Sequence, residues 1–216
     1  MSVVISIVGR SSSGKTTLLE NLIGELKRRG YNLATIKHSV SGFGLDQPGK
    51  DSWRLAEAGS GAVVLSSPQK VALIKPMNRE ATLEELLYLV DGDFDLILTE
   101  GFRGSTTPKI EVHRKELGGL LCSPEELFAL VTDEPLDIAV PQFSPGEVEA
   151  LVDLVEKRFL ALREVEETLL IINDTPISLN PFAMSIIHKT LLGMVSALRG
   201  AEEVKSLRIS LRRGQV

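Results

Sequence analysis

The sequence predicts an α/β fold in which helices flank a mainly parallel β-sheet, and two observations carry this prediction. Short apolar runs that are typical of buried strands alternate with longer segments whose apolar residues recur at helical spacing. A loop rich in glycine and serine, within SIVGRSSSGKTTLLENL, connects the first of these runs to the first helical segment. Repeated strand–helix–strand units of this kind build parallel sheets, because each helix carries the chain back across the sheet.

The composition limits the class of protein. The chain has 216 residues, 43% of them hydrophobic and 5% aromatic, and a formal net charge of −5. It can therefore form one large domain with an aliphatic core, with or without a small appendage, and it has no general field that attracts nucleic acid or an anionic membrane. The one cysteine, Cys122, excludes a disulfide framework and a multi-cysteine metal site within the chain.

The sequence contains neither a membrane helix nor a recognisable targeting segment. No apolar stretch reaches the roughly 18 residues that a transmembrane helix needs. The start, MSVVISIVG, lacks the basic region of a signal peptide and runs directly into a strand-like segment. We therefore expect a cytoplasmic protein.

The first three elements form a strand–helix–strand unit. Residues 3–8 are a β-branched run that predicts a strand buried on both faces. Helical spacing begins at Lys15, and the cationic turn at residues 27–29 followed by Gly30 ends that helix. Residues 32–37 then predict the second strand.

The middle of the chain continues the alternation. Strands are predicted at residues 62–65, 71–74, 94–100, 109–113 and 127–132, and helices at residues 81–90 and 144–159. The turn-rich SSPQK separates the first two of these strands. We therefore expect one α/β domain over residues 1–162.

The pattern changes near Arg163, and residues 163–216 predict a small strand–helix–strand appendage. A strand is expected within TLLIINDTPISLN, a helix from Pro181 to Gly200 with Asn180 as its N-cap, and a half-exposed strand in SLRISLRR. A unit this small is marginal alone, so it must dock on the main domain or on another copy.

We expect the appendage to help a dimer associate. Its helix has an apolar face, formed by Phe182, Ile186, Ile187, Thr190, Leu191, Met194 and Leu198, that its own strands cannot cover. Two appendages could pair their strands across a two-fold axis. Arg208 and Arg212 lie on the polar face of the last predicted strand. They could be exposed to solvent there, or they could bind an anionic cofactor.

Residues 9–16 match the pattern G-x-x-x-x-G-K-[ST], from Gly9 to Thr16, and predict a phosphate-binding loop. Small residues let backbone N–H groups wrap a phosphate chain, and the following helix directs its positive dipole end at the same anion. Lys15 can reach the β- and γ-phosphates, and the Thr16 hydroxyl can bind Mg²⁺. The alternative is a plain Ser/Gly turn, which the flanking strand and helix disfavour. The motif does not choose between ATP and GTP.

Other polar residues follow predicted strands, where parallel sheets bind ligands. Lys37 and His38 end the second strand, and Glu100 ends the strand FDLILTE, where a carboxylate can hold Mg²⁺ or orient an attacking water. Asp46, Lys50 and Asp51 lie in the loop after His38. His38 could equally be a solvated loop histidine.

These segments together resemble the MobB-type molybdopterin-guanine dinucleotide biosynthesis proteins over residues 3–159. The segments that carry the resemblance are GRSSSGKTTL, IKHS, DQPGKDSWRLAEAGS, LILTEGFRGSTTPKIEVHR, VTDEP and VPQF. The resemblance implies a P-loop NTPase fold and a homodimer that binds GTP with Mg²⁺ and hydrolyses it weakly. It also implies a protein that assists the guanylyltransferase attaching GMP to molybdopterin.

By position, the resemblance implies that Gly14, Lys15, Thr16 and Thr17 serve phosphate and metal, and that Asp46, Asp51 and Glu100 serve the metal or the attacking water. Together with the loop motif and the strand ends, this gives three expected sets of site residues. The nucleotide-binding set is Gly9, Ser11, Ser12, Ser13, Gly14, Lys15, Thr16, Thr17 and Asp133; the metal set is Thr16, Asp46, Asp51 and Glu100; the catalytic pair is Glu100 and Lys15. The usual guanine-reading pattern, Asn/Thr-Lys-x-Asp, is absent. Asp133 in VTDEP could accept from guanine, or it could simply form a turn before Glu134 and Pro135.

Three functions compete at this point. The first is a GTP-binding adapter, and the second is a small-molecule kinase or ligase on the same scaffold, for which Lys37 and His38 leave room. The third is a metal-insertion GTPase, which the lack of a His-rich tract or a cysteine pair disfavours.

Overall fold

A computed structural model of the protein describes residues 3–39, 42, 44, 46–90, 92–161, 170–172, 175–198, 204, 207 and 209. The chain divides into two compact units, residues 2–160 and residues 161–216. None of the helices in these described ranges combines the length and the hydropathy that a bilayer crossing requires.

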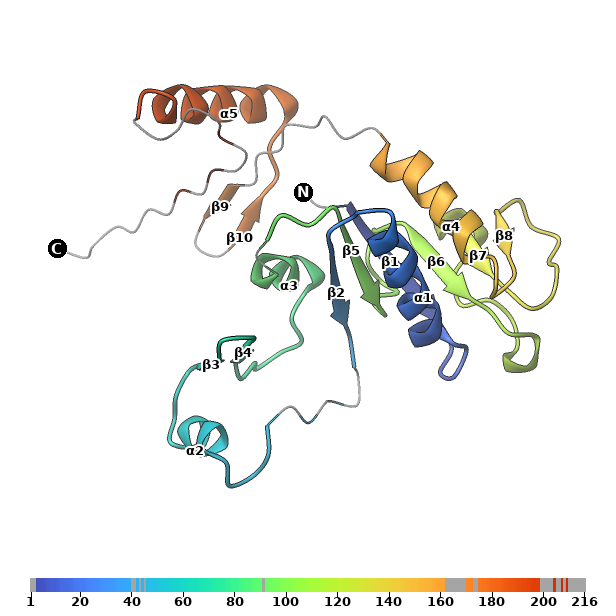
Figure 1. The fold of residues 1–216 in the computed structure, drawn as a ribbon, viewed down its shortest axis with the longest axis horizontal. Coiled ribbons are helices and arrows are strands. Elements are labelled where there is room, and N and C mark those ends of the chain that lie inside the picture. Colours follow the sequence, from blue (N-terminus) through green and yellow to red (C-terminus); the bar gives the residue numbers. More distant parts are fainter. Residues whose placement is uncertain are drawn as a thin grey trace. The chain divides into compact units, whose positions relative to one another are not determined.

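A six-stranded parallel sheet forms the centre of the first unit (Figure 1), in the order β2-β5-β1-β6-β7-β8. The strands are β1 (Val3–Gly9), β2 (Leu33–Lys37), β5 (Leu96–Glu100), β6 (Lys109–Val112), β7 (Leu127–Val131) and β8 (Gln142–Phe143). Every neighbouring pair is parallel, so the predicted mainly parallel sheet is confirmed. The two-residue strand β8 was not predicted, because so short a segment shows no periodicity.

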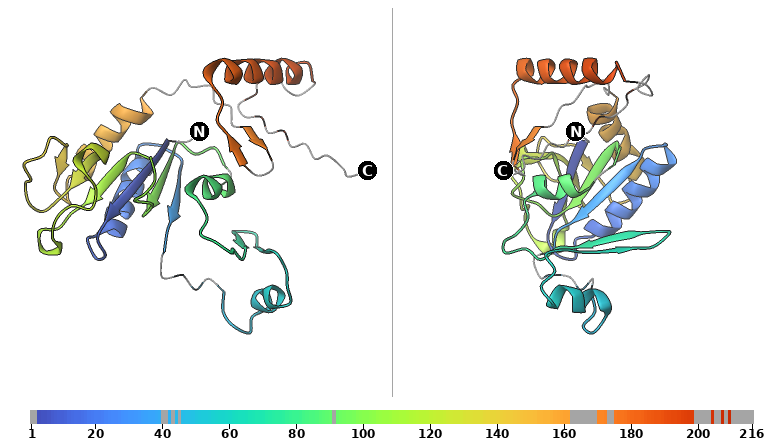
Figure 2. Two further views of the ribbon diagram at one scale, coloured as in Figure 1. Left: turned by 180° about the vertical axis from the view of Figure 1, so that it is seen from behind. Right: turned by 90° about the vertical axis from the view of Figure 1, so that its left-hand side faces the viewer.

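Helices cover the two faces of this sheet, and Figure 2 shows α1 and α3 on opposite sides of it. Alternate strand residues such as Ile5 and Leu98 face α1 (Lys15–Arg28) and α4 (Val148–Val155), which supply Leu22 and Val152 to the same core. Their neighbours in sequence, such as Ile97, face α3 (Leu83–Leu89). Because a strand alternates its side chains, β1 and β5 are buried on both faces, as their apolar runs predict.

A turn of π-helix, Glu156–Leu160, continues α4, and the end of α1 is joined to it by ion pairs. The Arg29 guanidinium lies 2.6 Å from the Asp153 carboxylate and 2.5 Å from that of Glu156. Glu25, one turn before, accepts from Arg28 and Arg29, and these bonds hold the pKa of its carboxyl at about 2. The helix that follows the glycine-rich loop is therefore anchored at its far end.

Loops rather than helices cover the second face of the sheet over β6 and β7. Val8 and Leu130 pack there against Cys122 and Val140. Glu111, in the middle of β6, is buried on this face, and its two carboxylate oxygens accept from the backbone N–H groups of Leu121 (2.6 Å) and Cys122 (3.0 Å). A buried carboxylate bonded in this way is stabilised, and it fixes the loop that precedes β7.

Two small elements are inserted between β2 and α3. The helix α2 (Asp51–Glu57) was not predicted, because its large apolar residues, Trp53 and Leu55, are two positions apart rather than three or four. The strands β3 (Val63–Ser66) and β4 (Val71–Ile74) form the predicted pair, an antiparallel hairpin. Large apolar side chains on it are exposed, namely those of Val64, Leu65, Val71 and Leu73.

The second unit contains β9 (Leu170–Ile172), β10 (Thr175–Ile177) and α5 (Pro181–Val195). Asn180 caps α5 as predicted, since its side-chain oxygen accepts from the Ala183 N–H at 2.8 Å. The prediction of one strand before this helix is wrong: β9 and β10 pair as an antiparallel hairpin. The predicted strand SLRISLRR and the end of the helix at Gly200 lie outside the described residues, apart from Leu207 and Ile209.

Candidate functional site

The glycine-rich loop leaves β1 at the carboxyl edge of the sheet and leads into α1. Three of its residues have positive φ: Gly9 at 147°, Ser12 at 63° and Gly14 at 96°. A Cβ atom on Gly9 would lie 2.5 Å from the Val112 carbonyl oxygen and 2.8 Å from Ser13 Oγ. Gly9 is therefore glycine because strand β6 and the loop itself leave no room for a side chain.

Lys15 and Ser13 direct polar atoms into this loop. The Lys15 Nζ donates to the carbonyl oxygens of Gly9 (3.1 Å) and Arg10 (2.7 Å), so the ammonium group lies over the loop. Ser13 is buried, and its hydroxyl makes no hydrogen bond to any described part of the chain. A cation and an unpartnered buried hydroxyl in a loop of small residues suit an anionic ligand.

Glu100 meets the loop from the neighbouring strand. The parallel register sets Glu100 beside Ile7 of β1 and Lys37 of β2. Its Oε2 accepts from the Thr16 hydroxyl at 3.1 Å and lies 3.2 Å from the Lys37 Nζ, and its side chain is 13% exposed. The structure thus brings Thr16, Lys37 and Glu100 together at one edge of the sheet.

A group of linked hydroxyls, of which those of Ser6 and Thr99 are buried, begins at Thr99, the residue before Glu100. Thr99 donates to Ser6 at 2.9 Å, and Ser6 Oγ lies 2.6 Å from Thr107 Oγ1, which is 2.6 Å from Ser105 Oγ. The Lys109 Nζ donates to the Ser105 carbonyl at 2.6 Å. These bonds hold the loop after Glu100 against β1, so the carboxylate is attached to a fixed backbone.

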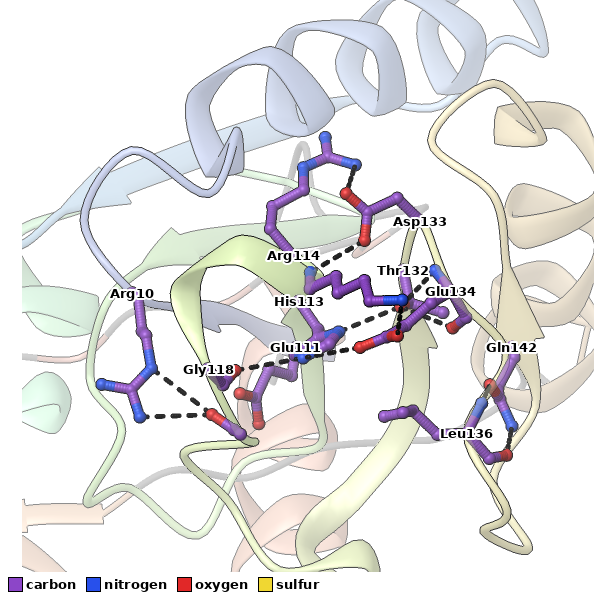
Figure 3. Close-up of polar contacts among 12 residues, drawn as sticks. Arg10, Glu111, His113, Arg114, Gly118, Thr132, Asp133, Glu134, Leu136 and Gln142 are labelled. Carbon is purple, nitrogen blue, oxygen red and sulfur yellow. Dashed lines mark hydrogen bonds and ion pairs between the residues drawn. The ribbon is translucent and has the colours of Figure 1, made fainter.

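On the other side of β1, two arginines bond to loop carbonyls. The Arg114 Nε donates to the Ser13 carbonyl at 3.0 Å. Arg10 donates to the Gly119 carbonyl through Nε (3.3 Å) and a terminal nitrogen (3.2 Å), as Figure 3 shows. Asp133 follows β7; its Oδ1 accepts from the Lys115 N–H at 2.9 Å. That bond, with the nearby Arg114 guanidinium, lowers the pKa of the Asp133 carboxyl.

His113 is buried between these loops. Its Nε2 lies 3.1 Å from the Gly118 carbonyl oxygen, to which it must donate because a carbonyl only accepts. Its Nδ1 lies 3.0 Å from the Thr132 hydroxyl on β7. His113 therefore joins the ends of β6 and β7 to the loop that also receives Arg10.

Three predicted site residues bond elsewhere. Asp46 accepts from the Ser52 hydroxyl at 2.7 Å, while the Asp51 side chain is 98% exposed and lies 3.8 Å from Arg54. Within the described ranges, neither carboxylate bonds to the loop or to Glu100. His38 pairs with Glu80, and its ring centroid is 5.0 Å from that of Phe102.

The oxygen atoms of Thr16 and Glu100 beside the loop suit a magnesium ion that is bound together with phosphate. No group of three or more His, Cys, Asp and Glu side chains that could hold a metal occurs among the described residues. Mg²⁺ in nucleotide sites keeps several waters and takes only one or two protein oxygens besides phosphate. The Thr16 hydroxyl and the Glu100 carboxylate, already 3.1 Å apart, fit that requirement.

The family model for "Molybdopterin guanine dinucleotide synthesis protein B", MobB, matches residues 4–133, which include the loop, Glu100, Arg114 and Asp133. The chain belongs to the MobB family. It is 37% identical over 155 residues to the molybdopterin-guanine dinucleotide biosynthesis adapter protein of Haemophilus influenzae, covering 71% of this chain and 87% of that one. The Escherichia coli adapter protein is 36% identical over 161 residues, covering 70% and 90%.

Solved MobB structures share the fold. A crystal structure of molybdopterin-guanine biosynthesis protein B superposes with a TM-score of 0.55 at 30% identity, over 72% of this chain and 99% of that chain.

A putative adapter protein of Methanocaldococcus jannaschii is 25% identical over 232 residues, covering 96% of this chain and 97% of its own. That match extends through the second unit, which the two bacterial adapter proteins do not cover in full.

Sequence reasoning identified the loop and Glu100 but assigned no role to Arg10 or Arg114. Both act on backbone carbonyls of segments about a hundred residues away, which no local pattern reveals. The pairing of Lys37 with Glu100 was accessible in principle, because both residues end strands of one parallel sheet.

We predict that Gly9→Ala destabilises the first unit by about 2–4 kcal/mol, because a side chain there combines a positive φ with overpacking against β6. Thermal unfolding should show a midpoint lower by roughly 5–10 °C. Gly24→Ala is the matched control: a Cβ at that position, inside α1, has nothing within 4 Å. It should stabilise the helix by about 0.5–1 kcal/mol. Equal stability of the two variants would contradict the packing of Gly9 against Val112.

Proposed function

We propose that the protein binds GTP with Mg²⁺ at the loop from Gly9 to Thr17 and acts as an adapter in molybdenum cofactor biosynthesis. In this role it assists the guanylyltransferase that attaches GMP to molybdopterin. The observation that carries the proposal is the arrangement of Lys15 over a loop of small residues with the Thr16–Glu100 pair beside it. The adapter names of the bacterial relatives, which cover this site, support the process.

The loop binds phosphate through its backbone and its lysine. The nucleotide-binding residues are Gly9, Ser11, Ser12, Ser13, Gly14, Lys15, Thr16, Thr17 and Asp133. Lys15 exchanges the carbonyls of Gly9 and Arg10 for phosphate oxygens, which are stronger acceptors because they are charged. The Ser13 hydroxyl supplies a further donor, and the N-terminus of α1 adds its dipole.

Thr16 and Glu100 hold the metal in this proposal. When bound, Mg²⁺ neutralises charge between the β- and γ-phosphates. The Glu100 carboxylate can also orient a water for attack on the γ-phosphate, and Lys37 beside it restrains that carboxylate. The metal role of Asp46 and Asp51 stays a prediction, because their bonds in the structure are to Ser52, Gln47 and Arg54.

We further propose that the protein is a homodimer. The hairpin β3–β4 supports this, because a two-stranded sheet with exposed Val64, Val71 and Leu73 is marginal unless something covers it. The exposed Phe182 and Met194 of α5 are the second candidate surface. No contact among the described residues specifically favours the kinase or ligase alternative.

A chain ending at Arg163 distinguishes the two surfaces. We expect it to associate as the full chain does if the hairpin forms the dimer, and Val64→Asp with Leu73→Asp in the full chain then to give monomers. Sedimentation at several concentrations measures this. A truncated monomer would instead place association in residues 164–216, and a monomeric full chain would overturn the dimer.

We predict that Lys15→Ala weakens GTP binding at least a hundredfold, since it removes a charged donor from the phosphates. The thermal midpoint should stay within about 2 °C, because among the described residues the Lys15 ammonium bonds only to loop carbonyls. Titration calorimetry with GTP measures the affinity. Lys27→Ala, an exposed change near the far end of the same helix, is the control for charge and should bind as the wild type does.

The same variants test the adapter role. Labelled GTP and molybdopterin are incubated with the guanylyltransferase, with the protein added or omitted. We expect the wild type to increase GMP attachment and Lys15→Ala to fail. Transfer by the protein without the guanylyltransferase would favour the kinase or ligase alternative. Wild-type affinity in Lys15→Ala would overturn the phosphate-loop assignment.

We predict that Glu100→Gln slows GTP hydrolysis about tenfold or more while GTP still binds within a few-fold, because the amide keeps the size of the side chain and loses its charge. Phosphate release with saturating Mg²⁺ measures the rate. Glu80→Gln is the control, since Glu80 pairs with His38 rather than with the loop. An unchanged rate in Glu100→Gln would leave Glu100 only a structural role.

A further inference from the structure

Arg114 connects the phosphate loop to Asp133 (Figure 3). Its Nε donates to the Ser13 carbonyl at 3.0 Å, and one terminal nitrogen lies 3.2 Å from where a Cβ on Gly14 would be. The other terminal nitrogen lies 3.9 Å from Asp133 Oδ2. One rigid guanidinium group, just after β6, thus rests on the loop backbone and faces a carboxylate just after the neighbouring strand β7.

One carboxylate oxygen of Asp133 is hydrogen-bonded within the protein, and the other can still accept a hydrogen bond. Its Oδ1 accepts from the Lys115 N–H, while its Oδ2 makes no hydrogen bond within the described part of the chain. The Asp133 side chain is 39% exposed, compared with 23% for Arg114. Because its pKa is lowered, the carboxylate is ionised at neutral pH and acts only as an acceptor.

The position of this pair fits the nucleoside end of a nucleotide. Glu100 and Thr16 lie on the β5 side of β1, and they mark the end of the loop where the metal and the γ-phosphate belong. The remainder of the nucleotide then extends toward β6 and β7, whose ends carry Arg114 and Asp133. Guanine presents two adjacent donors, N1–H and the 2-amino group, whereas adenine presents an acceptor at N1. An open carboxylate matches guanine.

We propose that Arg114 is a positioning residue that fixes Asp133 relative to the phosphate loop and thereby sets the preference for guanine over adenine. The inference rests on the proposed function, since it requires a nucleotide on the loop. In this arrangement, an arginine after β6 and an aspartate after β7 take the place of the missing Asn/Thr-Lys-x-Asp pattern.

The chain offers matched controls for both residues. Arg10 also bonds a loop carbonyl, that of Gly119, but it makes no contact with Asp133 within the described ranges. Glu134, next to Asp133, instead faces Lys115 at 3.5 Å and His113 at 4.0 Å. Arg10→Gln therefore removes a positive charge from the phosphate loop, and Glu134→Gln removes a negative charge next to Asp133, without altering the Arg114–Asp133 pair.

The test measures dissociation constants for GTP, ITP, ATP and pyrophosphate with Mg²⁺. We expect the wild type to prefer GTP to ATP at least tenfold, and ITP, which lacks the 2-amino group, to bind between them. Arg114→Gln should lower the GTP-to-ATP preference about tenfold while pyrophosphate binding changes a few-fold at most. Arg10→Gln should weaken all three triphosphates by one common factor.

Asp133→Asn gives an independent measurement if Arg114→Gln does not fold, because it leaves the Arg114–Ser13 bond in place. It should abolish the preference for GTP without changing pyrophosphate binding, while Glu134→Gln retains the preference. Equal weakening of GTP and ATP by Arg114→Gln would overturn the inference. A wild type that binds triphosphates without preference would also overturn it and leave the proposed function standing. A wild type that binds neither triphosphates nor pyrophosphate would overturn both.

Discussion

The parallel pairing of β1 with β5 on one side and β6 on the other is the constraint on which the site depends. It brings the ends of three strands to one edge, so the loop after Gly9 lies between Glu100 and the segment that carries His113 and Arg114. The same pairing explains why Gly9 has no side chain, since the Val112 carbonyl lies where a Cβ would be. The pairing of the strands therefore determines where the side chains of the site lie.

Loops without regular structure are held by side chains that bond to backbone atoms. Glu111 binds two N–H groups, and Arg10, His113 and Arg114 bind carbonyls, so each satisfies polar groups that no sheet or helix partner reaches. All four bond to the loop 118–122 or to the phosphate loop. The rigidity that a binding site needs is thus supplied from β6 and from the loop itself, with no further secondary structure.

The sequence predicted the sheet, the order of the main elements and the phosphate loop, because these depend on local patterns: apolar periodicity around β1 and α1, and the glycines that a tight loop requires. It did not predict β8 or the hairpin β9–β10, whose strands have only two or three residues, and it missed α2, whose large apolar residues Trp53 and Leu55 are not at helical spacing. The contacts of Arg10 and Arg114 join residues about a hundred positions apart, and only the folded chain brings them together. Asp46 and Asp51 were grouped with the site by resemblance, and the structure gives them other bonds.

The hydroxyls of Ser6, Thr99, Ser105 and Thr107 have a consequence for how this sequence can change. Each is bonded to another member of the group, and Ser6 and Thr99 are fully buried. Replacing one of them by an apolar residue leaves its neighbour with an unmet hydrogen bond, whereas replacing linked members together removes the whole requirement. Divergence at these four positions is therefore coupled: intermediates with one substitution are less stable than either end point, and we expect related sequences to exchange them as a set.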